Sequence, residues 1–243
     1  MKIIENIPPV IRLYQSLKYL KPYRKEFLAA RAAGDNEAER AYILKATDRW
    51  GNHLVKTFDV TLQVEGKENL PAHGPVIFAA NHQGYADIVI SCAVLNRFQF
   101  GFVAKENLSK IPLYGKWIKD IRSVMLERED ARASLRAINE GIGLLEKGFS
   151  LLVFPEGTRS RQKAMSRFRR GSLRLATKPG VPVVPITING THRIFEDTGV
   201  LRKGATVDFI IHPPIETKNM DKAEANRLTE TVEEIIGNAL SRC

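Results

Sequence analysis

Apolar side chains in the first 58 residues recur every three or four positions, the spacing of amphipathic helices. Between residues 10 and 33 they collect on one predicted helix face: Val10, Leu13, Tyr14, Leu17 and Leu20, extended by Phe27 and Leu28. Gly34 suits the end of this helix, and Asp35 suits the cap of a second helix that runs to about Phe58. The pattern predicts a helical hairpin over residues 1–58.

The pattern changes from residue 59 onward. Short apolar runs typical of buried strands alternate with helical patterns, which predicts an α/β domain over residues 59–243. The clearest helix is predicted over residues 130–147, before Gly148. A last helix is predicted to begin at Asp221, with Glu224 in the position of a capping box. We therefore expect a mixed central sheet flanked by helices, preceded by the amphipathic hairpin.

Composition and charge narrow the classes of protein. The 243 residues are 44% hydrophobic, which is enough for a buried core and excludes wholesale disorder. The formal net charge of +10 favours an anionic partner, which leaves nucleic acid, an acidic membrane surface and a phosphorylated substrate open. Between Gly157 and Phe195 there are nine Lys or Arg residues and no Asp or Glu. Two cysteines are too few for a disulfide framework and lack metal-ligand spacing, so we expect no metal.

The sequence shows no signal peptide and no apolar run of the roughly 20 residues that a membrane-spanning helix needs. Any contact with lipid would then be from the side, as a peripheral or monotopic protein on the cytoplasmic face of a membrane. The basic flanks and tyrosines of the hairpin suit a membrane-interface element that binds an anionic surface. The alternative is that the hairpin only packs its apolar face on the α/β domain.

The first chemical candidate lies where an apolar strand ends. His82 follows the run at 76–80, and Asp87 comes five residues later at the start of a predicted helix. Ligands of α/β sheets bind beyond the carboxyl ends of the strands, where His82 is expected. Histidine is a natural proton acceptor near neutral pH, and a carboxylate on its other nitrogen would fix the tautomer. Taken alone, the pair could also be a structural strand-end histidine beside a chance acid.

A second candidate is the loop at 154–160, which reads FPEGTRS after another apolar strand. Gly157 allows the backbone to approach a ligand closely, and Arg159 carries a planar fork suited to phosphate. The alternative is a turn that carries a solvated arginine. Basic side chains also follow apolar runs at Lys105 and Arg128. The segment VPVVP at 181–185 is predicted to be a buried edge-type strand, because its prolines restrict where it can pair.

These blocks, in this order, resemble the glycerolipid acyltransferase family, specifically its 1-acylglycerol-3-phosphate acyltransferase branch. The resemblance covers roughly residues 60–215 and rests on NHxxxxD at 81–87, the Lys105–Arg128 block, FPEGTRS and VPVVP. It implies an enzyme without a cofactor that moves an acyl group from acyl-ACP or acyl-CoA to the sn-2 hydroxyl of lysophosphatidic acid.

The resemblance also implies roles for individual residues. His82 would be the general base and Asp87 its partner. The phosphate and glycerol of the acceptor would be bound by Lys105, Arg128, Glu156, Gly157 and Arg159. The acyl-donor side would be lined by Val181, Pro182 and Pro185. The chain departs from the family pattern at Gly84, where serine is common, at Arg122, where glycine is usual, and at Glu127, where aspartate is usual.

Three alternatives remain open. The acceptor could be glycerol-3-phosphate or another lysophospholipid. Cys92 could form an acyl-enzyme, although its apolar surroundings are typical of an inert thiol. A basic module that binds membrane or nucleic acid without catalysis would explain the charge, but no nucleic-acid motif appears, so we expect no nucleic-acid partner.

Overall fold

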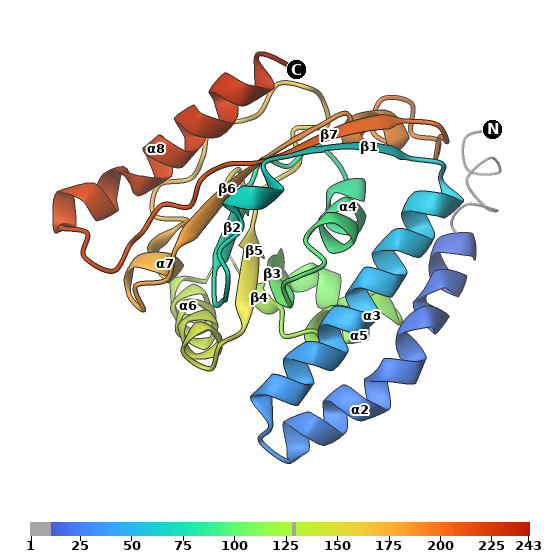
Figure 1. Cartoon of the computed structure of the whole chain (residues 1–243), viewed down its shortest axis with the longest axis horizontal. Helices are drawn as coiled ribbons and strands as arrows, with labels where there is room; N and C mark the ends of the chain where they lie inside the picture. Colours follow the sequence, from blue (N-terminus) through green and yellow to red (C-terminus); the bar gives the residue numbers. More distant parts are fainter. Residues whose placement is uncertain (1–10, 128–129) are drawn as a thin grey trace.

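A computed structural model describes residues 11–127 and 130–243, and its centre is a seven-stranded sheet (Figure 1). The strand order is β1-β7-β6-β2-β5-β3-β4, and every neighbouring pair is parallel except the antiparallel pair β6–β7. The strands are β1 Thr61–Glu65, β2 Ile77–Ala80, β3 Phe100–Lys105, β4 Val124–Leu126, β5 Ser150–Val153, β6 Val183–Asn189 and β7 Thr206–Ile211. The prediction of a mixed sheet is confirmed.

Helices cover both faces of the sheet (Figure 1). They are α2 Lys21–Ala32, α3 Asn36–Thr57, α4 Ala86–Val94, α5 Tyr114–Asp120, α6 Ala131–Glu146, α7 Arg174–Thr177 and α8 Lys222–Leu240. Figure 1 shows α6, α7 and α8 on one face and α3 and α4 on the other. Because both faces are covered, β2, β5 and β6 are buried along their whole lengths, which is why they read as continuous apolar runs.

The predicted helices at 130–147 and from Asp221 correspond to α6 and α8, and both are confirmed. The side chain of Asp221 accepts hydrogen bonds from the N–H groups of Ala223 and Glu224, and the Glu224 carboxylate accepts one from the N–H of Asp221. These reciprocal bonds form the capping box that the sequence predicted.

The N-terminal hairpin is present, but its first helix is not continuous. Residues 11–16 are α-helical, η1 (Leu17–Leu20) is a 3₁₀ helix, and α2 begins at Lys21. Pro22 explains the interruption, because proline lacks an N–H and its ring clashes with the carbonyl four residues earlier. The second helix agrees with the prediction, since Asp35 caps α3 by accepting a hydrogen bond from the N–H of Ala38.

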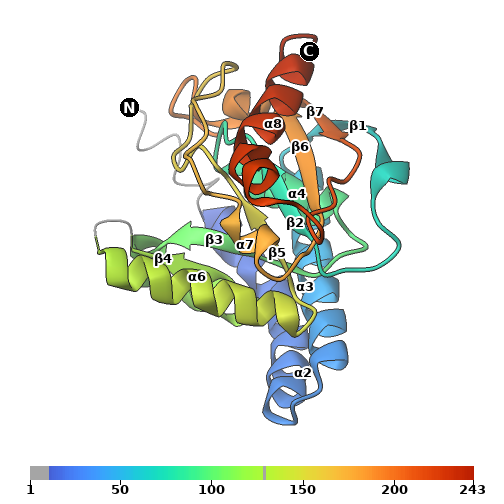
Figure 2. The same ribbon diagram turned by 90° about the vertical axis from the view of Figure 1, so that its left-hand side faces the viewer.

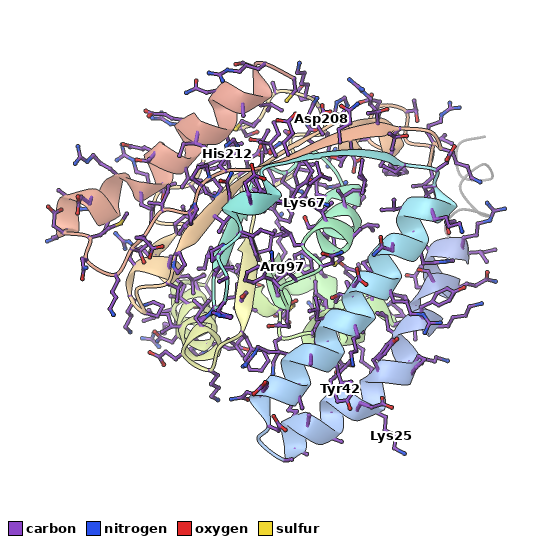
Figure 3. All side chains as sticks on the ribbon, viewed as in Figure 1. Lys25, Tyr42, Lys67, Arg97, Asp208 and His212 are labelled. Atoms are coloured by element: carbon purple, nitrogen blue, oxygen red, sulfur yellow. The ribbon has the colours of Figure 1, made fainter. Side chains whose placement is uncertain are left out.

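The hairpin packs on the α/β domain through α3. A Cβ atom built on Gly51 of α3 would lie 2.7 Å from the backbone nitrogen of Ala93 in α4, so the two helices touch through a residue without a side chain. Next to this contact, Trp50 is buried with its ring centroid 4.6 Å from that of Trp117. The other end of the hairpin, which carries Lys25 and Tyr42, extends away from the sheet (Figures 2 and 3). The boundary between residues 58 and 59 stays a prediction.

None of the described helices has both the length and the apolar character needed to cross a bilayer.

Candidate active site

His82 lies directly beyond the carboxyl end of β2, and Asp87 lies in the first turn of α4. The two side chains meet, with Nδ1 of His82 2.7 Å from Oδ2 of Asp87. The imidazole also stacks on the ring of Phe154, with centroids 3.9 Å apart. Since Asp87 binds the proton on Nδ1, the second ring nitrogen, Nε2, is the one that can take up a proton.

Asp87 is completely buried and has three hydrogen-bond donors. Its Oδ2 accepts from Nδ1 of His82 and, at 3.0 Å, from the N–H of Gly84. Its Oδ1 accepts from the hydroxyl of Thr191. Donors to both oxygens hold the carboxylate in place beside the imidazole.

The loop between β2 and α4 is tied to the end of β6. The side-chain amide of Asn81 donates to the carbonyl of Ile188 and accepts from its N–H, both at 2.8 Å. Oε1 of Gln83 accepts a hydrogen bond of 2.9 Å from the N–H of Gly190. These bonds fix the backbone on both sides of His82, so the imidazole is held by a rigid support.

Arg159 lies on the same side of the sheet as His82. Its Nη1 donates to Oε1 of Glu196 at 2.7 Å, and its guanidinium lies 3.5 Å from the ring centroid of Tyr85. Lys105 ends β3 and is exposed. Arg128 lies outside the described residues.

A cavity of about 640 Å³ joins these groups. His82, Lys105, Gly157 and Arg159 all contribute to its wall, together with Arg161, which the sequence had not singled out. Most of the remaining wall is apolar, including Leu13, Tyr14, Leu17, Trp50, Leu54, Val89, Phe102 and Tyr114. The cavity therefore combines a proton acceptor, cationic side chains and a long apolar surface that the N-terminal segment helps to form.

Comparison with known proteins agrees with this geometry. The model of the Acyltransferase family matches residues 61–189, which contain both His82 and Arg159. The chain belongs to this family.

Several named members are similar to the chain. A 1-acyl-sn-glycerol-3-phosphate acyltransferase of Arabidopsis thaliana chloroplasts, LPAT1, is 36% identical over 163 residues, which are 66% of this chain and 45% of that protein. A counterpart from Chlamydomonas reinhardtii is 39% identical over 65% of this chain and 48% of its own. The chain thus spans about half the length of these relatives. The crystal structure of the 1-acyl-sn-glycerophosphate (LPA) acyltransferase PlsC from Thermotoga maritima aligns with a TM-score of 0.74 and 29% identity, over 100% of this chain and 97% of that one.

In this site the side chain of Glu156 binds backbone N–H groups of neighbouring loops. Its buried carboxylate accepts from the N–H of His82 at 2.5 Å and from the N–H of Ser166 at 2.6 Å. Burial raises the pKa of Glu156, and the two N–H donors oppose that rise. Glu156 is not among the described residues that line the cavity, and its contacts hold the two loops together.

Val181, Pro182 and Pro185, predicted on the donor side, do not reach the described cavity wall. The carbonyl of Pro182 accepts from the N–H of Ile77 at the start of β2, whereas His82 follows the end of that strand. Pro185 is buried within β6 beside Ala79. The prediction of an edge-type strand is wrong here, because β6 pairs with β2 on one side and with β7 on the other. The three residues therefore lie at the starts and middles of parallel strands, away from the edge that carries His82.

Cys92 is fully buried in α4, where burial strongly raises the pKa of its thiol. Such a thiol is a poor nucleophile, because the thiolate is the reactive form.

Like Arg161, Thr191 and Glu196 belong to the site but were not predicted from the sequence. Thr191 lies 104 residues from Asp87 in the sequence, and no sequence motif around it indicates a contact with the site. Glu196 had one signal, because it is the first carboxylate after the acid-free stretch that begins at Gly157.

Proposed function

We propose that the chain transfers a fatty acyl group from an acyl thioester to the free sn-2 hydroxyl of 1-acylglycerol-3-phosphate, producing phosphatidic acid. The observation that carries this proposal is the single cavity in which the His82–Asp87 pair, Arg159 and Lys105 meet a long apolar wall. The names of the Acyltransferase-family relatives support the same reaction.

In the proposed reaction no acyl-enzyme forms. Nε2 of His82 takes the proton of the acceptor hydroxyl while its oxygen attacks the thioester carbonyl. The carbon–sulfur bond then breaks, and the imidazolium returns the proton to the departing thiolate, so that an ester and a thiol result. Asp87 stabilises the imidazolium between these two steps through its 2.7 Å contact with Nδ1.

The cationic groups place the acceptor. Arg159 and Lys105 bind its phosphate, and Gly157 lets the loop backbone come close to the glycerol. Arg128 belongs to the same predicted set. Glu156 serves this group indirectly, because it holds the loop of Arg159 against the backbone of His82. Holding the phosphate converts a chance encounter between the hydroxyl and the base into an oriented one.

The apolar wall accommodates acyl chains and keeps water from the thioester. The choice of a lysophospholipid over glycerol-3-phosphate as acceptor is supported by the names of the relatives. Either acyl-ACP or acyl-CoA supplies the same thioester. The exposed basic side chains Lys163, Arg167, Arg169 and Arg170 offer an anionic carrier a complementary surface.

We place the cavity mouth against an anionic membrane. Large exposed hydrophobic side chains include Ile11, Tyr14, Tyr85, Ile111 and Leu113, of which Tyr14, Tyr85 and Ile111 also line the cavity. Their arrangement allows a lipid acceptor to enter from the membrane without crossing water. Within the hairpin of residues 1–58, the segment around residues 11–17 would contact the membrane, because α3 packs against α4.

The direct test is incubation of the protein with an acyl thioester and, separately, lysophosphatidic acid, glycerol-3-phosphate and other lysophospholipids, with products identified by mass. We expect phosphatidic acid from lysophosphatidic acid and none with His82→Ala. Failure to acylate any acceptor, with the fold intact by circular dichroism, would contradict the proposal.

A further inference from the structure

The carboxylate of Glu196 occupies an unusual place beside the proposed phosphate site. Its side chain is 2% exposed, and Oε1 accepts from Nη1 of Arg159 at 2.7 Å and from the N–H of Tyr85 at 3.0 Å. Oε2 is buried without a hydrogen-bond partner among the described residues. Burying a carboxylate oxygen without a hydrogen-bond partner lowers the stability of the fold, so the position of Glu196 requires an explanation.

The space for this carboxylate comes from Gly84. A Cβ atom built on Gly84 would lie 2.4 Å from Oε2 of Glu196, too close for two such atoms. Gly84 does not have a positive φ, so its backbone conformation does not demand glycine. Gly84 is therefore needed because it has no side chain, which leaves space for Glu196, and not because of its backbone conformation.

Arg159 is fixed from two directions as a result. The Glu196 carboxylate holds Nη1 in the guanidinium plane, and the face of the guanidinium lies over the ring of Tyr85. The N–H of Tyr85 donates to the same Oε1 atom, so the carboxylate also fixes the backbone beside that ring. A flexible arginine loses several rotatable bonds on binding phosphate, and one that is already oriented loses fewer.

We propose that Glu196 is a positioning residue that holds Arg159 in the orientation in which it meets the acceptor's phosphate, and that Gly84 is the small residue that makes room for it. The proposal rests on the proposed function, in which Arg159 binds that phosphate. It gives Gly84 a role that is paired with that of Glu196.

The first test compares variants at position 196 by steady-state kinetics with lysophosphatidic acid and an acyl thioester. Glu196→Ala should raise the acceptor KM about five- to tenfold, with kcat and the donor KM changed less than about twofold. Glu196→Gln keeps an oxygen for Nη1 and should raise the acceptor KM less. Asp197→Ala is the matched control, since its carboxylate lies in the same loop but bonds His192. A fall in acceptor KM for Glu196→Ala would show that the carboxylate only competes with phosphate, and would overturn the proposal.

The second test asks whether Gly84 acts through Glu196. Gly84→Ser alone should displace the carboxylate and raise the acceptor KM to a level similar to Glu196→Ala. In the Glu196→Ala background, Gly84→Ser should add less than about twofold, because the clash has been removed. If the two substitutions multiply in their effects on the acceptor KM, or if Gly84→Ser lowers only kcat, Gly84→Ser acts on the loop of His82. Either result would contradict the proposed pairing of Gly84 with Glu196.

Arg159→Ala separates this proposal from the proposed function. If both hold, Arg159→Ala raises the acceptor KM, and Glu196→Ala added to it has no further effect on KM. If Arg159→Ala leaves the acceptor KM unchanged, Arg159 does not bind the phosphate, and the proposed function of this residue is refuted. An acceptor KM that depends on Arg159 but not on Glu196 refutes only the positioning role. Thermal melting of each variant shows whether a kinetic change reflects loss of fold.

Discussion

The guanidinium of Arg122 forms two hydrogen bonds of 2.7 Å with the completely buried carboxylate of Glu39, one to each oxygen. Glu39 lies in α3 and Arg122 lies in the turn between α5 and β4, so the pair joins the hairpin to the sheet. Arg31 of α2 binds the same carboxylate at 2.7 Å. Arg122 also has a φ of 67°, a backbone conformation that favours glycine.

This arrangement predicts a stability difference between two variants at one position. Arg122→Ala should lower the free energy of unfolding by about 2–3 kcal/mol, because Glu39 stays buried with only Arg31 as partner. Arg122→Gly loses the same bonds but relieves the strained φ, so it should be more stable than Arg122→Ala by about 1 kcal/mol. Denaturant melts of the two proteins measure both values. Equal stability of the wild type and Arg122→Ala would mean that the pair contributes nothing.

The proposed catalytic pair, His82 and Asp87, predicts losses in turnover without loss of fold. His82→Ala should reduce kcat by about 10²–10⁴-fold, the usual contribution of a general base. Asp87→Asn should also be severe, because an amide can hold the imidazole in the wrong tautomer. Turnover measured beside circular dichroism tests both. Near-normal rates in either folded variant would eliminate the dyad.

Arg159→Lys keeps the positive charge but loses the planar fork. We expect the acceptor KM to rise about tenfold and the donor KM to change much less. The comparison needs both substrates varied separately with one enzyme preparation. Equal increases in the two KM values would argue against a phosphate ligand at Arg159.

Cys92 should be chemically silent. Its buried thiol has a strongly raised pKa, so Cys92→Ala should keep most of the activity. Cys243 is exposed, and alkylating agents should react there first, so the experiment uses a Cys243→Ser background. Activity that falls in step with Cys92 modification, or an acyl-thioester trapped on Cys92, would contradict direct attack.

The proposed membrane contact predicts an effect that depends on position. Leu113 is 63% exposed in the segment between β3 and α5, and Leu135 is 59% exposed on α6. Leu113→Asp should weaken sedimentation with anionic vesicles and lower activity on vesicle-borne acceptor, while a dispersed short-chain analogue is still acylated. Leu135→Asp is the control, equally exposed but on an element that does not line the cavity. Similar vesicle binding by both variants would remove the proposed orientation.

The N-terminal hairpin allows a complementary experiment. If its apolar side chains belong to the core, replacing them lowers the stability of the protein; if they contact the membrane, replacing them weakens membrane binding. Leu20 is buried, whereas Leu13 and Leu17 are partly exposed and line the cavity. Replacing all three by Asp therefore mixes loss of core with loss of membrane contact, and single substitutions at Leu13 and Leu20 are needed to separate them.

Features that depend on neighbouring residues could be predicted from the amino-acid sequence. Strand runs, the capping box at Asp221 and the cap at Asp35 follow from local backbone preferences. The contact between His82 and Asp87 belongs to this group, because five residues that join a strand end to a helix start keep both side chains together.

Contacts between residues that are distant in the sequence could not be predicted in this way. Thr191 and Glu196 reach the site because β6 runs parallel to β2 and ends beside it, which no local spacing encodes. The same parallel alignment carries Val181 and Pro182 to the opposite edge of the sheet. Glu156 could be recognised as part of a motif, but its partners are N–H groups of His82, 74 residues away, and of Ser166. Chain direction and long-range packing set these contacts, and both appear only once the sheet is assembled.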